Sequence, residues 1–276
     1  MRKLILTSIL LASIIGCKSY VQVFKTNSSI NANQNGFYVY ENDSVKIIYS
    51  FWQKGGLMTF AIYNKLDQPL FVDWKKSAYI DNGVKLNYWI DEVKSEGTST
   101  SDGLYYEGPL LKPGYAISRT GRASITSTVK IERITFIPPK SYYFRSQFFI
   151  FPINFYQLSA DTKYNEVDNK GNSKKKTKVY KQTFTKKTSP LVFRNYLTLS
   201  LSEDFYTEFY VDNEFYIQEI LEMDKKHFGQ YRIDETKSGK FFIKDKYGNP
   251  VLFSDFQSPT SFYLEIPREA SIEKRN

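Results

Sequence analysis

The feature that most restricts the fold is a series of short segments in which apolar and polar residues alternate. Alternation places every second side chain on one face of a β-strand, so that this face can be buried. The clearest case is 57–63, and similar or β-branched and aromatic segments lie at 37–40, 45–52, 70–74, 77–80, 84–90, 126–137, 191–201, 205–211 and 262–266. Many short strands separated by turns predict a mainly β protein built as an antiparallel β-sandwich.

One connection between these strands has a recognisable turn sequence. Asp81-Asn82-Gly83 separates the predicted strands at 77–80 and 84–90. Asn-Gly favours a type I′ turn, because both central residues must accept a positive φ. We therefore expect a tight β-hairpin at this position.

The segment 212–229 is the one convincing helix in the sequence. Ile217, Ile220 and Leu221 would form an apolar stripe on it, and Asp212 or Asn213 could cap its N-terminus. Gly229 suits the position after a helix C-terminus. Beyond it, 241–243 and 251–253 predict a small hairpin and 262–266 a last strand. We expect 212–276 to pack on a sandwich formed by 37–211.

The N-terminus has the pattern of a secretory signal. Arg2 and Lys3 precede a mostly apolar segment, 4–15, that is too short for a permanent membrane span. The segment ends Ile14-Ile15-Gly16-Cys17, which looks like a bacterial lipobox with Ile in place of the usual Leu. Cys17 is the only cysteine of the chain. The sequence therefore predicts cleavage after residue 16 and lipidation of Cys17.

The residues after Cys17 predict where such a lipoprotein would reside. Lys18-Ser19 follow the cysteine, whereas an inner-membrane retention signal would have Asp in the second position. An acidic cluster typical of surface export does not follow either. We therefore expect an anchor in the bacterial outer membrane, on its periplasmic face. Asn and Ser are frequent at 25–36, so 17–36 is interpreted as a polar tether.

A resemblance supports the same location. The stretch Phe60-Ala-Ile-Tyr-Asn-Lys-Leu-Asp-Gln-Pro-Leu-Phe-Val-Asp-Trp-Lys-Lys-Ser77, followed later by Ile137-Pro138-Pro139, resembles Ig-like modules of uncharacterised Bacteroidota lipoproteins. The resemblance covers roughly 37–157. It implies an Ig-like fold and a membrane-anchored location, and it brings no catalytic residues.

The positive charge of the chain is concentrated in one segment. The formal net charge is +9, and removal of the signal would leave +7. Residues 161–187 alone carry a net +6. We expect 159–190 to be a disordered basic insert, and the candidate anion-binding residues within it are Lys174, Lys175, Lys176, Lys178, Lys181, Lys186 and Lys187.

Two interpretations of the insert remain open. It is either a solvated loop or a contact surface for anionic lipid, lipopolysaccharide or an acidic envelope protein. We expect no nucleic-acid partner, since the insert lacks the arginines and interleaved aromatic residues typical of such sites.

Enzyme motifs are missing from the sequence. His227 is the only histidine, and it is expected at a solvated helix end. The chain has no G-x-S-x-G, no H-E-x-x-H, no Walker A and no dinucleotide-binding motif. We therefore expect no catalytic nucleophile, no metal and no cofactor. The leading hypothesis is a non-catalytic lipoprotein that binds or scaffolds an envelope partner.

A second hypothesis belongs to a different class. A glycan hydrolase needs only two suitably spaced carboxylates, and a glycan-binding module needs aromatic faces beside polar groups. The Gly-containing loop at 102–107 offers both, through Asp102, Tyr105, Tyr106 and Glu107. The alternative function is thus a carboxylate-dependent glycan hydrolase or a glycan-binding module.

Overall fold

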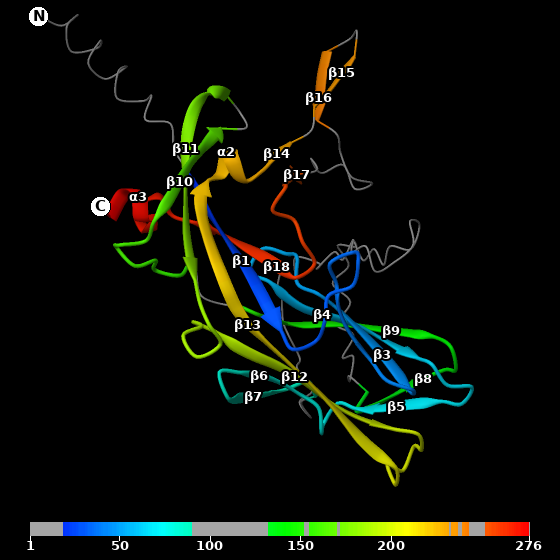
Figure 1. The fold of residues 1–276 in the computed structure, drawn as a ribbon. Helices are drawn as coiled ribbons and strands as arrows, with labels where there is room; N and C mark the ends of the chain where they lie inside the picture. Colours follow the sequence, from blue (N-terminus) through cyan, green and yellow to red (C-terminus); the bar gives the residue numbers. More distant parts are fainter. Residues whose placement is uncertain are drawn as a thin grey trace, which may run out of the picture.

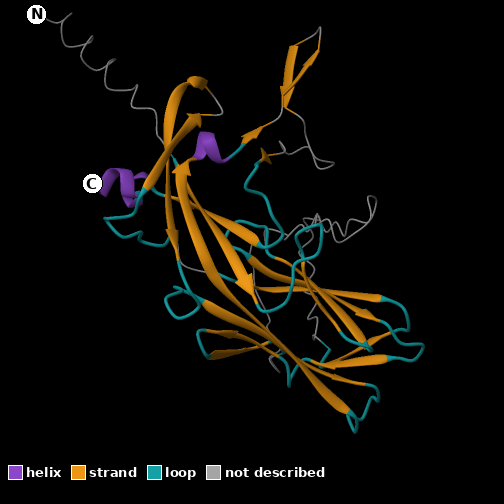
Figure 2. Ribbon diagram, viewed as in Figure 1, coloured by secondary structure: helices purple, strands orange, loops and turns teal. Residues whose placement is uncertain are grey.

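A computed structural model describes residues 19–89, 132–151, 155–169, 172–231, 233–236, 239–242 and 252–275. These residues form a mainly β protein with antiparallel sheets and short helical turns near the C-terminus. Figure 2 shows strands throughout the body and helix only at one end. The predicted fold class, a mainly β protein arranged as a β-sandwich, is confirmed.

The larger sheet contains ten strands. Its main path runs through β10 (Tyr164–Asn169), β11 (Asn172–Thr183), β13 (Glu208–Asp224), β12 (Val192–Ser200), β5 (Leu70–Asp73) and β8 (Ile134–Ile137). Branches add β1 (Tyr20–Ser28), β18 (Ser261–Ile266), β6 (Ala78–Asp81) and β7 (Val84–Asn87). The long strand β13 therefore connects the two ends of the sheet, as Figure 1 shows.

The smaller sheet contains four strands and covers the inner face of the larger one. Its order is β2 (Tyr38–Glu41), β3 (Val45–Ser50), β4 (Leu57–Asn64) and β9 (Tyr142–Phe149). Aromatic rings from both sheets meet between them. Phe215 of β13 has ring-centroid distances of 5.0 Å to Tyr49, 5.2 Å to Phe51 and 5.3 Å to Phe193. Burial of these large side chains supplies the main stabilisation of the sandwich.

A buried polar network connects the two sheets. Tyr88 donates a hydrogen bond to Asn195 Oδ1 at 2.7 Å. Tyr49 Oη accepts hydrogen bonds from the side-chain amides of Asn195 (3.1 Å) and Asn213 (2.8 Å). Each of these groups is buried and has a partner, so the network fixes the alignment of the sheets without leaving its polar atoms unsatisfied.

The helix predicted at 212–229 is wrong, because β13 occupies this segment as far as Asp224. Only α2 (Lys225–Phe228) is helical there. The register between β1 and β13 shifts at Gln218, which is exposed in a β-bulge. The bulge keeps Ile217 and Ile220 on the same buried face although they are three residues apart. This spacing imitates the stripe of an amphipathic helix.

The polar tether predicted for 17–36 is also wrong over much of its length. Tyr20–Ser28 forms β1, which pairs with β13 on one side and with β18 on the other. Tyr20, Val21, Val23 and Phe24 are buried. The prediction failed because it was based on the polar composition of 25–36. The apolar residues of β1 lie at 20–24, just before that stretch.

Near the C-terminus the observed pairing differs from the predicted one. β16 (Gly239–Phe242) pairs with β15 (Ile233–Thr236), and not with the segment at 251–253. β17 (Leu252–Phe253) pairs with β14 (Gln230–Tyr231). The chain ends in the turns η1 (Arg268–Ala270) and α3 (Ile272–Arg275). A small hairpin after the helix is thus confirmed, but it lies one segment earlier than expected.

The predicted Asn-Gly turn is confirmed. Asn82 and Gly83 join β6 to β7 with φ angles of 45° and 86°. Both values are in the left-handed region that a type I′ turn requires. The local sequence was sufficient here because the turn depends on two residues and not on distant contacts.

Candidate functional site

The basic insert is an ordered hairpin and not the disordered loop expected for 159–190. β10 and β11 pair with each other, and β11 also pairs with the last part of β13. Tyr180 lies opposite Glu222, and Thr183 lies opposite Glu219. The few apolar residues of the segment contribute to this pairing, because the rings of Tyr164 and Tyr180 pack across the hairpin in a tilted arrangement with a centroid distance of 5.3 Å. We name β10 and β11 together the cationic hairpin.

The lysines of the cationic hairpin and of the loop after it have different surroundings. Lys181 forms an ion pair with Glu219, and Lys186 forms one with Glu214 at 2.5 Å. Lys176 lies 3.9 Å from Asp168, and both side chains are more than half exposed. Lys178 lies 4.4 Å above the ring of Tyr164, and Lys187 is exposed. Lys181 and Lys186 therefore help to hold this segment against β13. Lys176 and Lys187 are exposed, and Lys178 is half-buried.

β10 and β11 lie at the end of the molecule where β1 begins, as Figure 1 shows. Tyr20, the first residue of β1, is opposite Asp224. Tyr180 is opposite Glu222, so the antiparallel register puts Lys178 at about the level of Tyr20 and Lys176 beyond it. Cys17 precedes Tyr20 by three residues, which can span about 10 Å at most. β1 therefore begins at the end of the sheet that also carries the hairpin lysines.

Hydrogen bonds to side chains hold this end of the molecule together. Glu222, which is 1% exposed, accepts hydrogen bonds from Gln22 Nε2 at 2.9 Å and from the backbone amide of Ile272 at 2.7 Å. Tyr20 donates a hydrogen bond to Glu273 at 2.9 Å. The C-terminal turn is thus fixed to β1 and β13 beside the hairpin, which makes this end a firm support for it.

Several predicted site residues lie outside the described part of the chain. They are Cys17 and the glycan-loop residues Asp102, Tyr105, Tyr106 and Glu107. The side chains of Lys174 and Lys175 also lie outside it, although their backbone belongs to β11. The lipidation of Cys17 and the role of 102–107 therefore stay predictions.

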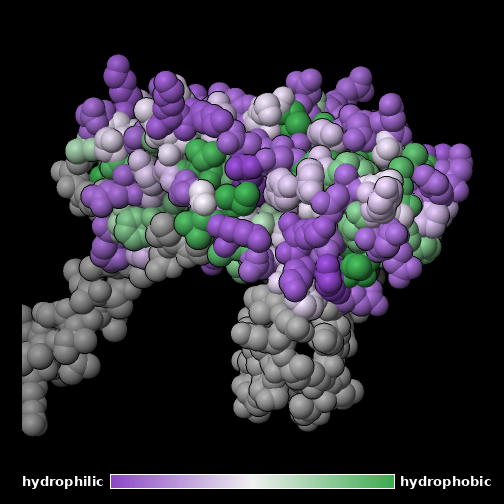
Figure 3. Space-filling model, turned by 90° about the horizontal axis from the view of Figure 1, so that it is seen from below, coloured by the Kyte–Doolittle hydropathy of each residue, from purple (hydrophilic) through white to green (hydrophobic). Residues whose placement is uncertain are grey.

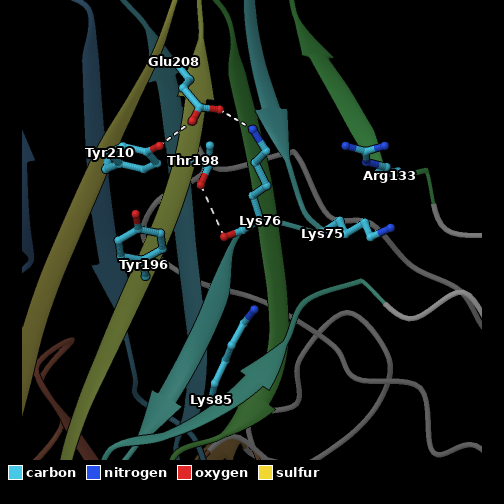
Figure 4. Close-up of a pocket in the computed structure, with 8 residues that line it drawn as sticks. All are labelled: Lys75, Lys76, Lys85, Arg133, Tyr196, Thr198, Glu208 and Tyr210. Atoms are coloured by element: carbon cyan, nitrogen blue, oxygen red, sulfur yellow. Dashed lines mark hydrogen bonds and ion pairs between the residues drawn. The ribbon is translucent and has the colours of Figure 1, made fainter. Parts of the chain in front are cut away.

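A second cluster of charges lies at the opposite end of β13 and was missed by the sequence analysis. It surrounds a hollow of about 510 Å³ on the outer face of the larger sheet, drawn in Figure 4, and its lining residues are Lys75, Lys76, Lys85, Arg133, Tyr196, Thr198, Glu208 and Tyr210. They come from separate segments of the chain, so no local motif could have identified them. We name this hollow the cationic pocket.

Asp73 organises the cations on one side of the pocket. Its buried carboxylate accepts hydrogen bonds from Arg133 at 2.8 Å and from the backbone amides of Lys75 and Lys76 at 2.9 and 3.3 Å. Burial alone would raise the pKa of Asp73, but these hydrogen bonds outweigh burial and hold the pKa below its usual value. Asp73 thus stays ionised and positions the turn that carries both lysines.

A polar wall forms the other side of the pocket. Glu208 accepts hydrogen bonds from Lys76 and Tyr210, and both lower the pKa of its carboxyl. Tyr210 stacks with Tyr196 at a centroid distance of 5.6 Å and remains 52% exposed. The wall therefore offers an ionised acceptor beside an accessible aromatic surface.

Other chemistry receives no support from the described residues. They contain no group of three or more side chains suited to a metal ion, and no helix long and apolar enough to cross a membrane. His227 is 6% exposed, so the prediction of a solvated helix-end histidine is wrong. It packs against Phe256 at a centroid distance of 5.9 Å. On the face drawn in Figure 3, hydrophilic residues predominate and hydrophobic ones form small groups between them.

Comparisons with family models, with curated proteins and with solved structures find no match to this chain. The two cationic regions are therefore interpreted from their own geometry.

Proposed function

We propose that the chain is a non-catalytic lipoprotein of the bacterial outer membrane, anchored at Cys17 on the periplasmic face. Its cationic hairpin binds the anionic headgroups of the membrane that holds the anchor. The observation that carries the proposal is that β1 begins three residues after Cys17, at the end from which the hairpin lysines project.

Electrostatics favours the membrane over a distant acidic protein as the partner. The screening length at physiological salt is about 8 Å, so a lysine interacts strongly with headgroups only when it lies close to them. A lipid at Cys17 would hold Tyr20 within about 10 Å of the headgroups. Because Lys176 lies beyond the level of Tyr20, it would come closer to the headgroups than Tyr20 does. Each lysine near an anionic membrane contributes about 1 kcal/mol, which adds to the affinity of the acyl chains.

The anchor is tested separately from the hairpin. Wild type and Cys17→Ser are produced in a Gram-negative host with a clickable palmitate analogue. We expect wild type to carry the label and to fractionate with the outer membrane, and Cys17→Ser to do neither. Labelled Cys17→Ser, or unlabelled wild type, would contradict lipidation at this residue.

The hairpin is tested with residues 17–276 carrying Cys17→Ser and with vesicles containing either phosphatidylglycerol or only phosphatidylcholine. We expect binding to the anionic vesicles alone, with weaker binding at high salt. Lys176→Gln with Lys178→Gln should weaken binding about 30-fold, which corresponds to about 2 kcal/mol. The matched control is Lys46→Gln with Lys140→Gln, a partly exposed and an exposed lysine of the sandwich that form surface ion pairs.

Three outcomes would contradict membrane binding by the hairpin. They are equal binding to neutral vesicles, equal weakening by the control pair, and capture of an acidic envelope protein without any affinity for vesicles.

A further inference from the structure

The cationic pocket contains positive charge that the described part of the chain does not neutralise. Arg133 is paired with Asp73, and Lys76 is paired with Glu208. Lys75 and Lys85 are exposed and form no ion pair among the described residues, although the ammonium group of Lys75 lies 5.6 Å from the ring centre of Trp89. Two uncompensated lysines at one hollow raise the local concentration of anions there.

The pocket also has features that a simple anion site does not need. Tyr210 presents a half-exposed ring, and its hydroxyl is oriented by Glu208. Carboxylate oxygens accept hydrogen bonds from hydroxyl groups, and an aromatic ring can cover an apolar surface of a ligand. The hollow thus combines hydrogen-bond acceptors, an aromatic surface and cations. These features suit a ligand that has hydroxyl groups, an apolar face and a negative charge, respectively.

The lysine on the polar wall is held from two sides. The ammonium group of Lys76 pairs with Glu208 and lies 5.9 Å from the ring centre of Phe205. Phe205 has a φ of 60°, a left-handed conformation that a bulky residue adopts only at a cost. Strain beside the pocket, in a turn that contacts one of its lining residues, is typical of a site with a defined geometry.

We propose that the cationic pocket binds an acidic sugar, a pyranose ring that carries a carboxylate. Lys85 binds the carboxylate, Lys75 at the rim of the pocket adds to the positive field, and Glu208 accepts hydrogen bonds from the ring hydroxyls. The apolar face of the sugar lies against Tyr210. This site is independent of the cationic hairpin, which lies at the other end of β13, and it does not require lipidation of Cys17.

D-glucuronate is the probe, with D-glucose, acetate and inorganic phosphate as comparison ligands. Binding to residues 17–276 carrying Cys17→Ser is measured by calorimetry and by saturation-transfer NMR. We expect glucuronate to bind at least tenfold more tightly than each comparison ligand, because only glucuronate satisfies the charge, the hydroxyl acceptor and the aromatic face together.

Two variants separate the parts of the site. Lys75→Gln with Lys85→Gln should weaken glucuronate binding about tenfold, whereas Tyr210→Ala should remove the preference for glucuronate over acetate. Lys46→Gln with Lys140→Gln is the control for net charge alone. The affinity of this double variant for glucuronate should match that of wild type. Circular dichroism checks that each variant keeps the β fold, so a loss of binding reports on the site.

Four results would overturn the proposal. Glucose binding as tightly as glucuronate would exclude the role of the lysines, and acetate or phosphate binding as tightly would exclude the sugar. If the control double variant weakens glucuronate binding as much as Lys75→Gln with Lys85→Gln does, the attraction is a general effect of net charge. No saturation transfer at 20-fold excess over the protein, or at any higher glucuronate concentration, would mean that the pocket does not bind this class of ligand.

Discussion

Near Asp224, where β13 ends, lysines lie along a projecting hairpin, whereas near Glu208, where it begins, cations surround a hollow. β13 has 17 residues, so the two regions are on the order of 50 Å apart. In the hairpin, neighbouring lysines are close in sequence and spread over a surface. In the pocket, cations distant in sequence line one hollow of about 510 Å³. Charge density along a chain therefore does not show where charges converge in space.

The largest expected change in stability comes from truncating one side chain of the core that lies between the two sheets. Phe215→Ala should lower the free energy of unfolding by about 3–5 kcal/mol, because the fully buried ring packs against aromatic residues of both sheets. Urea denaturation measures this change. Tyr206→Ala is the control, since Tyr206 is 89% exposed and should change stability by less than about 0.5 kcal/mol. Similar stability losses in the two variants would contradict the assignment of Phe215 to the core between the two sheets.

Asp73→Asn separates the two regions, because it acts on the pocket alone. We expect a loss of about 2 kcal/mol in stability, since a buried charged acceptor loses its ionic hydrogen bonds. Glucuronate affinity should fall as the turn carrying Lys75 relaxes. Vesicle binding by the hairpin should stay at the wild-type level. A parallel loss of vesicle binding would show that the regions are coupled.

The same residue gives a pH dependence. The folded state lowers the pKa of Asp73, so its contribution to stability is complete above the unfolded pKa of about 3.9. That contribution is lost as the pH falls through the lower folded pKa. Wild type should therefore lose more stability than Asp73→Asn between pH 5 and pH 2, as measured by thermal unfolding. Parallel curves for the two proteins would contradict this assignment.

Gly83→Ala tests how precisely the β6–β7 hairpin presents Lys85 to the pocket. Gly83 has a φ of 86° and open space around the position of an added Cβ, so only the backbone conformation resists the change. We expect a loss of about 1 kcal/mol and a modest fall in glucuronate affinity. Gly83→Asn is the control, because Asn tolerates this conformation better. Equal losses for Ala and Asn would mean that another contact is responsible.

The smallest effect is expected at the base of the cationic hairpin. Lys181→Gln removes one of two lysines paired with Glu219, while Lys25 remains at 2.7 Å. Because Lys181 is half exposed, the loss should be about 0.5 kcal/mol and should shrink at high salt. Urea denaturation at low and at high salt measures it. A loss above about 2 kcal/mol would show that the pair is a principal support of the hairpin.

The sequence predicted strands well where burial alternates with period two or where a turn has its own chemistry. The strand at 57–63 and the Asn82-Gly83 turn needed only local information. The sequence misled where tertiary structure changed the period. The bulge at Gln218 placed Ile217 and Ile220 on one face, and their spacing favoured a helix.

Less of the candidate site could be predicted. The lysine-rich segment was recognised from composition, but its order depends on pairing with β13, which lies about 40 residues later in the sequence. The pocket was missed because Lys75, Lys85 and Arg133 meet only after the larger sheet forms. No motif links them, since their spacing reflects strand order and not a local turn.

The position of β1 has a mechanical consequence for a chain held at Cys17. A force pulling on the anchor would act along the axis of β1, which pairs antiparallel with β13 and β18. The strand would be loaded in shear, so several inter-strand hydrogen bonds on both edges would have to break together. A strand peeled from one edge would instead lose its bonds one at a time. The sheet would thus resist mechanical unfolding most strongly at the point where the load enters it.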